Sequence, residues 1–240
     1  EQERLAAEAL ALGLAGEHRS ALLRAVSHDL RTPLSTIHAV ASDLRDEEGS
    51  YDAATRDELL DLVVDEAERL DRLVANLLSL SRIEAGALQP DLRSVALDEL
   101  LGQCVKRHAR LVRDRKVSVD VPFTLPSVEA DWTLVDQAVT NLVVNAVRHA
   151  PEGSRIWVAA RRVDDEWVEV AVTDQGPGVA PEIRAAVLEP FRRGPESTSS
   201  GVGLAIVRAV VDAHGGKLEI DDAPGGGGTQ VRFTLPVRHG

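Results

Sequence analysis

The sequence predicts an α+β protein in which a long antiparallel helical hairpin precedes a domain that packs helices on a sheet. Apolar residues recur at spacings of three and four through roughly residues 1–86, the pattern of amphipathic helices. Beyond Pro90 short alternating stretches, typical of strands, are mixed with further helical ones. Because the regular order of βαβ units is lacking, we expect an α/β sandwich and not a Rossmann sheet. We place the hairpin at 1–88 and the second domain at 93–240.

The hairpin is predicted from two apolar stripes that a polar break at Glu47–Asp52 separates. The second stripe ends at Gly86. One hairpin has too few faces to bury both stripes, so we expect two copies to pair into a four-helix bundle, a homodimer. The first stripe is Leu22, Leu23, Val26, Leu30, Leu34, Ile37 and Val40, and the second is Leu59, Leu62, Val63, Leu70, Leu73, Leu77, Leu80 and Ile83.

The second domain is expected to alternate strands and helices without an internal repeat. Asp164-Asp165 separates two strand-like runs and predicts a hairpin turn. Gly225–Gly228 predicts a loop between the last two strands. The expected strands are 117–121, 156–160, 167–173, 217–221 and 230–235, and the expected helices are 132–149 and 203–213.

Composition and charge exclude several classes of function. The net charge of −12 argues against nucleic-acid binding, which depends on basic surface. No apolar run approaches the roughly 20 residues that cross a bilayer, so no membrane contact is expected within this segment. The single cysteine, Cys104, lies in an amphipathic stretch and is expected to be a buried, inert thiol. The chain lacks methionine and opens inside a helical pattern, so we expect a fragment whose upstream segment is missing.

Residues 27–34, Ser-His-Asp-Leu-Arg-Thr-Pro-Leu, combine a histidine, an acid and a proline inside a helix. Pro33 costs the helix about 3 kcal/mol, and such a local conflict is typical of functional sites. The register places His28 off the centre of the apolar stripe, where a neutral imidazole is a good nucleophile. Asp29 can hold one ring nitrogen and leave the other free to attack. A merely solvated surface histidine is the alternative, but it leaves Pro33 unexplained.

This segment resembles the phosphoacceptor box of bacterial sensor histidine kinases, and the hairpin resembles their dimerisation and histidine-phosphotransfer domain. The resemblance implies that His28 is phosphorylated and that Asp29 is its acid–base partner. It also implies that Thr32 helps to position water when phosphate is removed from a partner response regulator.

Two asparagines, Asn141 and Asn145, lie on one face of an apolar helix. Buried amides need partners, and an amide oxygen can bind Mg²⁺, although two satisfied core amides would explain the pattern equally well. Residues 141–149 resemble the N box of the same kinases, which implies that Asn145 is a magnesium ligand and that Asn141 lies beside the phosphates. Arg148 keeps a phosphate-facing charge, and His149 stands where the family usually has tyrosine, at the ribose or adenine wall.

Asp174, Gly176 and Gly178 directly follow a predicted strand. Such a pattern is by default only a turn. It resembles the G1 box of the Bergerat ATP fold, which implies that the Asp174 carboxylate accepts the adenine amino group. The two glycines would then let the backbone pass close to the base.

Gly201, Gly203 and Leu204 open a predicted helix, whose N-terminus leaves amides for phosphates. They resemble the G2 box, and Phe191 and Arg193 belong to a segment that resembles the F box. The lid between Arg193 and Gly201 is shorter than is common in the family, which can affect ATP affinity or closure.

The motifs together span about residues 20–237 and imply a Bergerat (GHKL) ATP-binding domain after the hairpin. The resemblance implies ATP and Mg²⁺ as cofactors, autophosphorylation of His28, and phosphoryl transfer to an aspartate in the receiver domain of a response regulator. Phosphatase activity on that regulator is a second expected activity. It also implies a cytoplasmic location, as part of a longer sensor that can be membrane-bound. The alternatives are a degenerate, phosphatase-biased or scaffold kinase, and another ATPase of this fold, which would lack the His-box hairpin.

Overall fold

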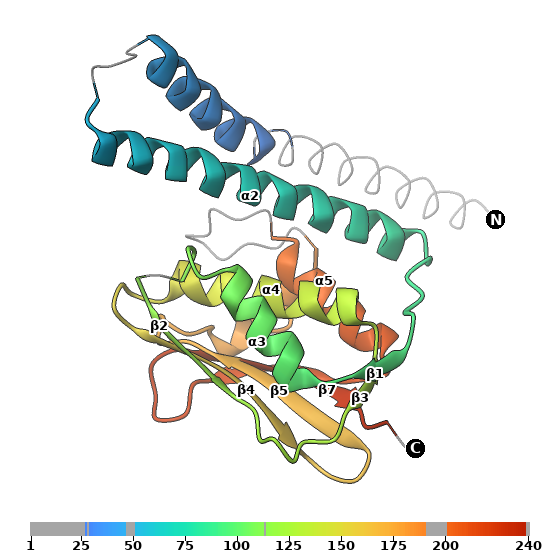
Figure 1. Cartoon of the computed structure of the whole chain (residues 1–240). Coiled ribbons are helices and arrows are strands. Elements are labelled where there is room, and N and C mark those ends of the chain that lie inside the picture. The colour runs from blue at the N-terminus through green and yellow to red at the C-terminus, as the bar shows by residue number, and fades with distance from the viewer. Residues whose placement is uncertain (1–26, 28, 47–50, 113, 191–200, 239–240) are drawn as a thin grey trace, which may run out of the picture. The chain divides into compact units, whose positions relative to one another are not determined.

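The structure is a computed structural model, and it describes residue 27 and residues 29–46, 51–112, 114–190 and 201–238 (Figure 1). The chain divides into two compact units. The first comprises residues 1–75 and 198–200, and the second comprises 76–197 and 201–240. Helix α2 (Ala53–Glu84) therefore begins in the first unit and ends in the second.

Of the hairpin that the sequence predicts, the first unit contains the described helix 29–46 and most of α2, whereas Leu22, Leu23 and Val26 of the first stripe lie outside the described residues. Residues 29–46 form one helix that continues past Pro33 without a break. At the start of α2, the Thr55 N–H donates to Asp52 Oδ1 at 2.7 Å. The Tyr51 hydroxyl donates to Asp43 Oδ2 at 2.5 Å and ties the connection to the preceding helix. Several large apolar side chains of this unit are exposed, namely Leu34, Leu60, Leu62, Val64 and Val74. A single copy of the hairpin thus leaves apolar surface uncovered.

In the second unit, three helices lie on one face of a five-stranded sheet (Figure 1). The helices are α3 (Leu97–Arg107), α4 (Trp132–His149) and α5 (Gly203–Ala213). The strands are β1 (Arg93–Val95), β2 (Lys116–Asp120), β3 (Val128–Ala130), β4 (Arg155–Arg162), β5 (Trp167–Thr173), β6 (Leu218–Asp222) and β7 (Thr229–Pro236). Two short 3₁₀ turns, η1 (Pro181–Ile183) and η2 (Ala186–Leu188), follow β5.

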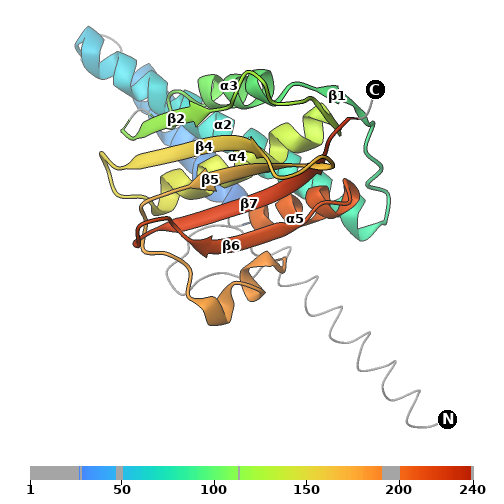
Figure 2. The ribbon, with the colours of Figure 1, turned by 90° about the horizontal axis from the view of Figure 1, so that it is seen from below.

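The larger sheet has the strand order β2-β4-β5-β7-β6, and Figure 2 shows its strands side by side. Strands β2 and β4 are parallel, and the other neighbours are antiparallel. Strands β1 and β3 form a separate two-stranded sheet. The expected α+β sandwich is confirmed, and each expected strand and helix is present to within a few residues.

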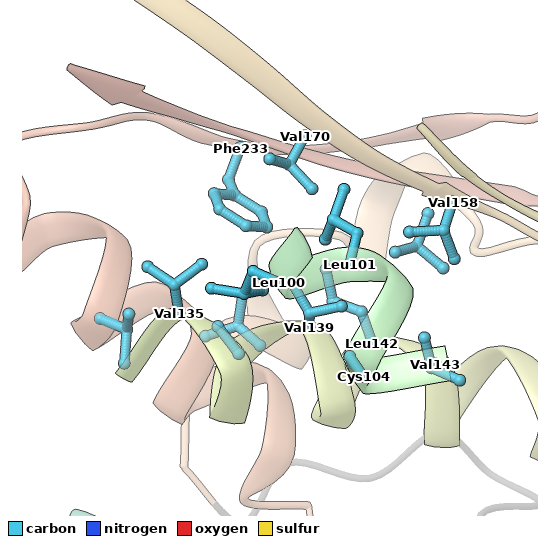
Figure 3. Packing of buried hydrophobic residues seen from close by; sticks show 14 of the residues in the cluster. Leu100, Leu101, Cys104, Val135, Val139, Leu142, Val143, Val158, Val170 and Phe233 are labelled. Carbon is cyan, nitrogen blue, oxygen red and sulfur yellow. The ribbon is translucent and has the colours of Figure 1, made fainter. Parts of the chain in front are cut away.

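The core of the second unit lies between the large sheet and the helices (Figure 3). Alternating strand residues point inward and meet the apolar faces of α3 and α4. The predicted burial of Cys104 is confirmed: its side chain is fully buried, and burial raises the pKa of the thiol to about 11. The fully buried residues labelled in Figure 3 include Phe233, Leu100, Leu101, Val135, Val139, Val143, Val158 and Val170.

Two polar residues fix the start of α4 to the end of α5. Asp131 caps α4, because its Oδ1 accepts from the N–H groups of Thr133 at 2.9 Å and Leu134 at 3.1 Å. The Asp131 N–H donates to Nε2 of buried His214 at 3.0 Å. His214 caps the end of α5, and its Nδ1 donates to the Val210 carbonyl at 2.7 Å. These hydrogen bonds thus fix the position of α4 relative to α5, the two helices that carry the predicted phosphate-side motifs.

Candidate nucleotide-binding site

The predicted site residues of the second unit come from three segments. Asn141, Asn145, Arg148 and His149 lie on the second half of α4. Asp174, Gly176 and Gly178 follow β5, and Gly201, Gly203 and Leu204 stand at the start of α5. The predicted F-box residues Phe191 and Arg193 lie outside the described residues, as does the predicted phosphoacceptor His28.

The two other predicted residues of the first unit lie on the helix 29–46. Asp29 is buried, whereas Thr32 is exposed. The Thr32 carbonyl accepts from the Thr36 hydroxyl at 3.2 Å, one turn further along. The Thr32 side chain therefore lies on the solvent side of a continuous helix.

Asp174 is buried at the end of β5 and is held by backbone donors. Its Oδ1 accepts from the Gly176 N–H at 2.7 Å and from the Thr229 N–H at 3.3 Å. Burial is the main cause that raises the pKa of Asp174, and these two N–H groups and nearby His149 oppose it. A buried carboxylate of this kind is a directed hydrogen-bond acceptor for a ligand that brings its own N–H group.

The glycines around Asp174 are required by close backbone approaches. A Cβ on Gly176 would lie 2.8 Å from the His149 carbonyl oxygen, so the loop after β5 contacts the end of α4. A Cβ on Gly228 would lie 2.0 Å from the Asp174 carbonyl oxygen, and Gly228 has a φ of +118°. The loop after β5 thus packs between the end of α4 and the start of β7.

The same geometry brings in Thr229, which the sequence motifs did not single out as a site residue. Its side chain is buried, and its carbonyl accepts the Asp174 N–H at 2.8 Å. Thr229 begins β7 and Asp174 directly follows β5, so the two residues are neighbours just beyond the last paired residues of these strands. The signal in the sequence is a threonine directly after four glycines, at the start of a strand.

Asn141 lies between the start of α5 and the end of α2. A Cβ on Gly203 would lie 3.6 Å from Asn141 Cγ, so the two predicted phosphate-side motifs are neighbours. Asn141 is buried, and its amide is hydrogen-bonded to the amide of Asn76. Sequence patterns gave no indication of Asn76, which resembles any polar residue on a helix.

His149 ends α4 beside Asp174. Burial is the main cause that lowers its pKa, the charge of Arg148 lowers it further, and Asp174 opposes the shift. The imidazole therefore stays neutral at pH 7 and can pack on an apolar or aromatic ligand group without a charge of its own.

Asn145 lies one turn after Asn141 on α4 and is half-buried, and its role as a magnesium ligand stays a prediction. Among the described residues, no three His, Cys, Asp or Glu side chains gather into a metal cluster. Mg²⁺ in nucleotide sites does not need such a cluster, because phosphates and water supply most of its ligands.

Two protein families match the sequence. Residues 18–86 match the family described as "His Kinase A (phospho-acceptor) domain". Residues 130–239 match the family described as "Histidine kinase-, DNA gyrase B-, and HSP90-like ATPase". The two matches fall on the predicted hairpin and on the unit that contains the candidate site.

Among curated proteins, similar chains include two from Mycobacterium tuberculosis. Sensor protein KdpD is 37% identical over 236 residues, which are 94% of this chain and 27% of KdpD. Sensor-like histidine kinase SenX3 is 37% identical over 219 residues, which are 88% of this chain and 52% of SenX3. The chain therefore spans about half or less of the length of these relatives.

Among solved structures, the mycobacterial sensor histidine kinase MprB has a TM-score of 0.56 at 35% identity, with 61% of this chain and 98% of that chain covered. ShkA, solved in complex with AMPPNP, has a TM-score of 0.65 at 28% identity, with 92% of this chain and 46% of that chain covered. None of the helices that the structure describes has the length and apolar character to cross a membrane.

Proposed function

Because this chain belongs to the sensor histidine kinases of two-component systems, we propose that it uses ATP to phosphorylate its own His28. We further propose that the phosphoryl group passes to an aspartate in the receiver domain of a response regulator. The observation that carries this proposal is that one unit contains Asp174 next to Gly176 and Asn141 next to Gly203. The same chain has the His28-Asp29 pair in the sequence of its hairpin, whose second helix is α2.

The proposed nucleotide contacts follow from the polarity of the site. The buried Asp174 carboxylate accepts the adenine amino group, with Thr229 beside it, and neutral His149 packs at the edge of the base or ribose. The N-terminus of α5 supplies free N–H groups to the phosphates. Asn145 is the protein ligand proposed for Mg²⁺, which neutralises phosphate charge when bound.

The proposed reaction is phosphoryl transfer to an imidazole. A ring nitrogen of His28 attacks the γ-phosphorus, and a P–N bond forms as the bond to the β–γ bridging oxygen breaks and ADP leaves. Asp29 accepts a hydrogen bond from the other ring nitrogen and keeps the attacking nitrogen unprotonated. We assign the phosphotransfer role to residues 1–88 and the ATP-binding role to 93–240.

We also propose that two copies pair through their hairpins into a four-helix bundle. The exposed apolar residues Leu34, Leu60 and Val64 support this arrangement. The segment is proposed to act in the cytoplasm as the signalling part of a longer sensor, in line with the short share of its relatives that it spans.

The test is autophosphorylation with ATP labelled on the γ-phosphate. The wild-type chain should acquire label that is lost in acid and survives alkali, as phosphohistidine does. His28→Gln should abolish labelling and leave ATP affinity within a few-fold, because His28 is not among the residues to which we assign nucleotide binding. Undiminished labelling of this variant, or alkali-labile label, would contradict the proposal.

A second activity, phosphatase action on the phosphorylated regulator, is supported by the exposed Thr32. Thr32 falls four residues after His28, a spacing that predicts one shared helical face for the two side chains. Its hydroxyl can hold a water in line with an aspartyl phosphate.

A further inference from the structure

Four polar side chains of the second unit form one connected hydrogen-bond network. The Ser79 hydroxyl donates to Gln137 Oε1 at 2.8 Å, and Gln137 Nε2 donates to Asn76 Oδ1 at 3.2 Å. Asn76 Nδ2 donates to Asn141 Oδ1 at 3.1 Å, and Asn141 Nδ2 donates back to Asn76 Oδ1 at 3.3 Å. Two of the four residues come from the last turns of α2 and two from α4.

The network couples the orientations of its three amides to one another. A hydroxyl that donates to Gln137 Oε1 leaves Nε2 as the end that faces Asn76. Asn76 must then present its oxygen to Gln137, and its own Nδ2 reaches Asn141. The Asn141 amide therefore cannot turn over alone, because Asn76 and Gln137 would have to turn with it to keep these bonds.

The packing around the network makes this orientation costly to change. Asn141 is only 8% exposed, and Leu80, one turn after Asn76, is 3% exposed within the core of the same unit. Asn76, Ser79 and Gln137 are half-buried, so an unpaired amide is most expensive at Asn141. The last turns of α2 are thus a structural part of the unit that carries the candidate nucleotide site.

The two bonds to Asn76 leave Asn141 with one N–H and one oxygen lone pair for a ligand. Gly203 opens α5 beside the same amide, since a Cβ added to it would lie 3.6 Å from Asn141 Oδ1. The remaining N–H and lone pair of Asn141 therefore lie next to the start of α5, where we propose that the phosphates bind.

We propose that Asn76 is a positioning residue for the nucleotide phosphates, acting through Asn141 with Gln137 and Ser79 behind it. The inference rests on the proposed function, because it requires Asn141 to face the phosphates. In consequence, the nucleotide site is incomplete without the end of the helix that also forms the hairpin. A fixed amide loses less freedom on binding than one that must be ordered by the ligand.

The test measures binding of Mg²⁺–ATP and of adenosine by calorimetry, with the full chain. Asn76→Ala should weaken Mg²⁺–ATP binding by about three- to tenfold, the range of one well-placed hydrogen bond, and leave adenosine binding unchanged. Gln137→Ala should act in the same direction with a smaller effect. Ser81→Ala, an exposed change on the same helix, is the matched control and should leave both affinities as in the wild type.

A double-mutant cycle shows whether Asn76 acts through Asn141. In an Asn141→Ala background, Asn76→Ala should cause no further loss of Mg²⁺–ATP affinity. Asn76→Asp, which keeps the size and the acceptor but loses the donor to Asn141, should also weaken Mg²⁺–ATP binding. It serves as a second variant if the alanine substitution prevents folding.

Three outcomes would overturn the inference. One is an unchanged or tighter Mg²⁺–ATP affinity in Asn76→Ala, which would make the α2 contact neutral or competitive. Another is an equal loss of adenosine affinity, which would mark a general structural effect. The last is additive losses in the cycle. If Asn141→Ala alone has no effect, the assignment of Asn141 to the phosphates fails as well, whereas the His28 labelling test is unaffected.

Discussion

The proposed role of Asp174 in nucleotide binding comes with a cost to stability. Its folded-state pKa is raised mainly by burial, so the folded state takes up this proton more readily than the unfolded chain. The cost of the buried charge is therefore present at pH values above both pKa values and disappears as the pH falls through the raised one. The proposed use of Asp174 as a charged acceptor for the nucleotide would account for such a cost.

We predict that Asp174→Asn weakens ATP binding by about tenfold or more, because the adenine amino group loses a charged acceptor. The midpoint of thermal unfolding should stay the same or rise at pH 7, since the buried charge is removed. Calorimetric titration with ATP and thermal melts measure the two effects. In the wild type, ATP affinity should also fall on acidification at a higher pH than an ordinary aspartate would give. Normal ATP affinity in the variant would place the adenine elsewhere.

Of the two proposed activities, only dephosphorylation of the regulator is proposed to depend on the Thr32 hydroxyl. Thr32→Ala should keep autophosphorylation of His28 near normal and slow dephosphorylation of the regulator by about tenfold, the value of one good hydrogen bond to water. The measurement is loss of phosphate from the purified cognate regulator, with wild type and variant side by side. Equal rates would mean that the hydroxyl has only a structural role.

At the scale of elements, the loop after β5 has no room for a side chain at Gly176 or Gly228, whereas Gly102 in α3 has open space around it. Gly228→Ala would place a methyl group 2.0 Å from the Asp174 carbonyl oxygen at a φ of +118°, which must displace the backbone. We predict a loss of about 2–4 kcal/mol in the free energy of unfolding, together with weaker ATP binding. Gly102→Ala, inside α3 with nothing within 4 Å, should raise the free energy of unfolding by about 0.5–1 kcal/mol.

Denaturant unfolding of the two alanine variants beside the wild type measures both predictions. A Gly228→Ala chain as stable as wild type would show that the start of β7 can move away from Asp174 without consequence.

The elements whose determinants are local could be predicted from the sequence. Helix α4 follows its apolar period and the capping Asp131, and its predicted bounds match those observed. The turn between β4 and β5 was predicted from Asp164-Asp165, and Asp164 Oδ1 indeed accepts from the N–H groups of Glu166 and Trp167 at 2.8 Å each. In both cases the side chain that specifies the structure lies within three residues of the backbone that it contacts.

Contacts between distant segments left no comparable signal. Gly225–Gly228 was correctly predicted as a loop, but the tight approach of Gly228 to Asp174 depends on the pairing of β5 with β7. Asn76 is one of many polar residues on a long helix, and only its place beside Asn141 distinguishes it. The parallel pairing of β2 with β4 likewise depends on tertiary packing.

For the whole molecule, the apolar surface of the hairpin predicts the oligomeric state. Leu60 and Val64 are 45% and 42% exposed and lie one turn apart on α2. Burying such side chains contributes about 1.5–3 kcal/mol each, so their replacement by charged residues should disfavour pairing strongly. We predict that the wild-type chain is a dimer in solution and that the double substitution Leu60→Glu with Val64→Glu yields a monomer.

Sedimentation equilibrium measures the mass, which should be about twice 25.8 kDa for the wild type. The exposed polar change Asp57→Asn on the same helix is the control and should remain dimeric. A wild-type monomer, or a dimer that survives both glutamates, would show that the copies associate through another surface or not at all.

The buried Cys104 makes this chain well suited to spectroscopy. It is the only cysteine, and a thiol with a pKa of about 11 and no exposure reacts slowly with maleimides, which attack the thiolate. Fluorophores or spin labels can therefore be attached at chosen surface positions, such as Asp57→Cys and Glu182→Cys, without first removing the native sulfur. Distances between the hairpin and the ATP-binding unit could then be followed during turnover in a chain whose core is untouched.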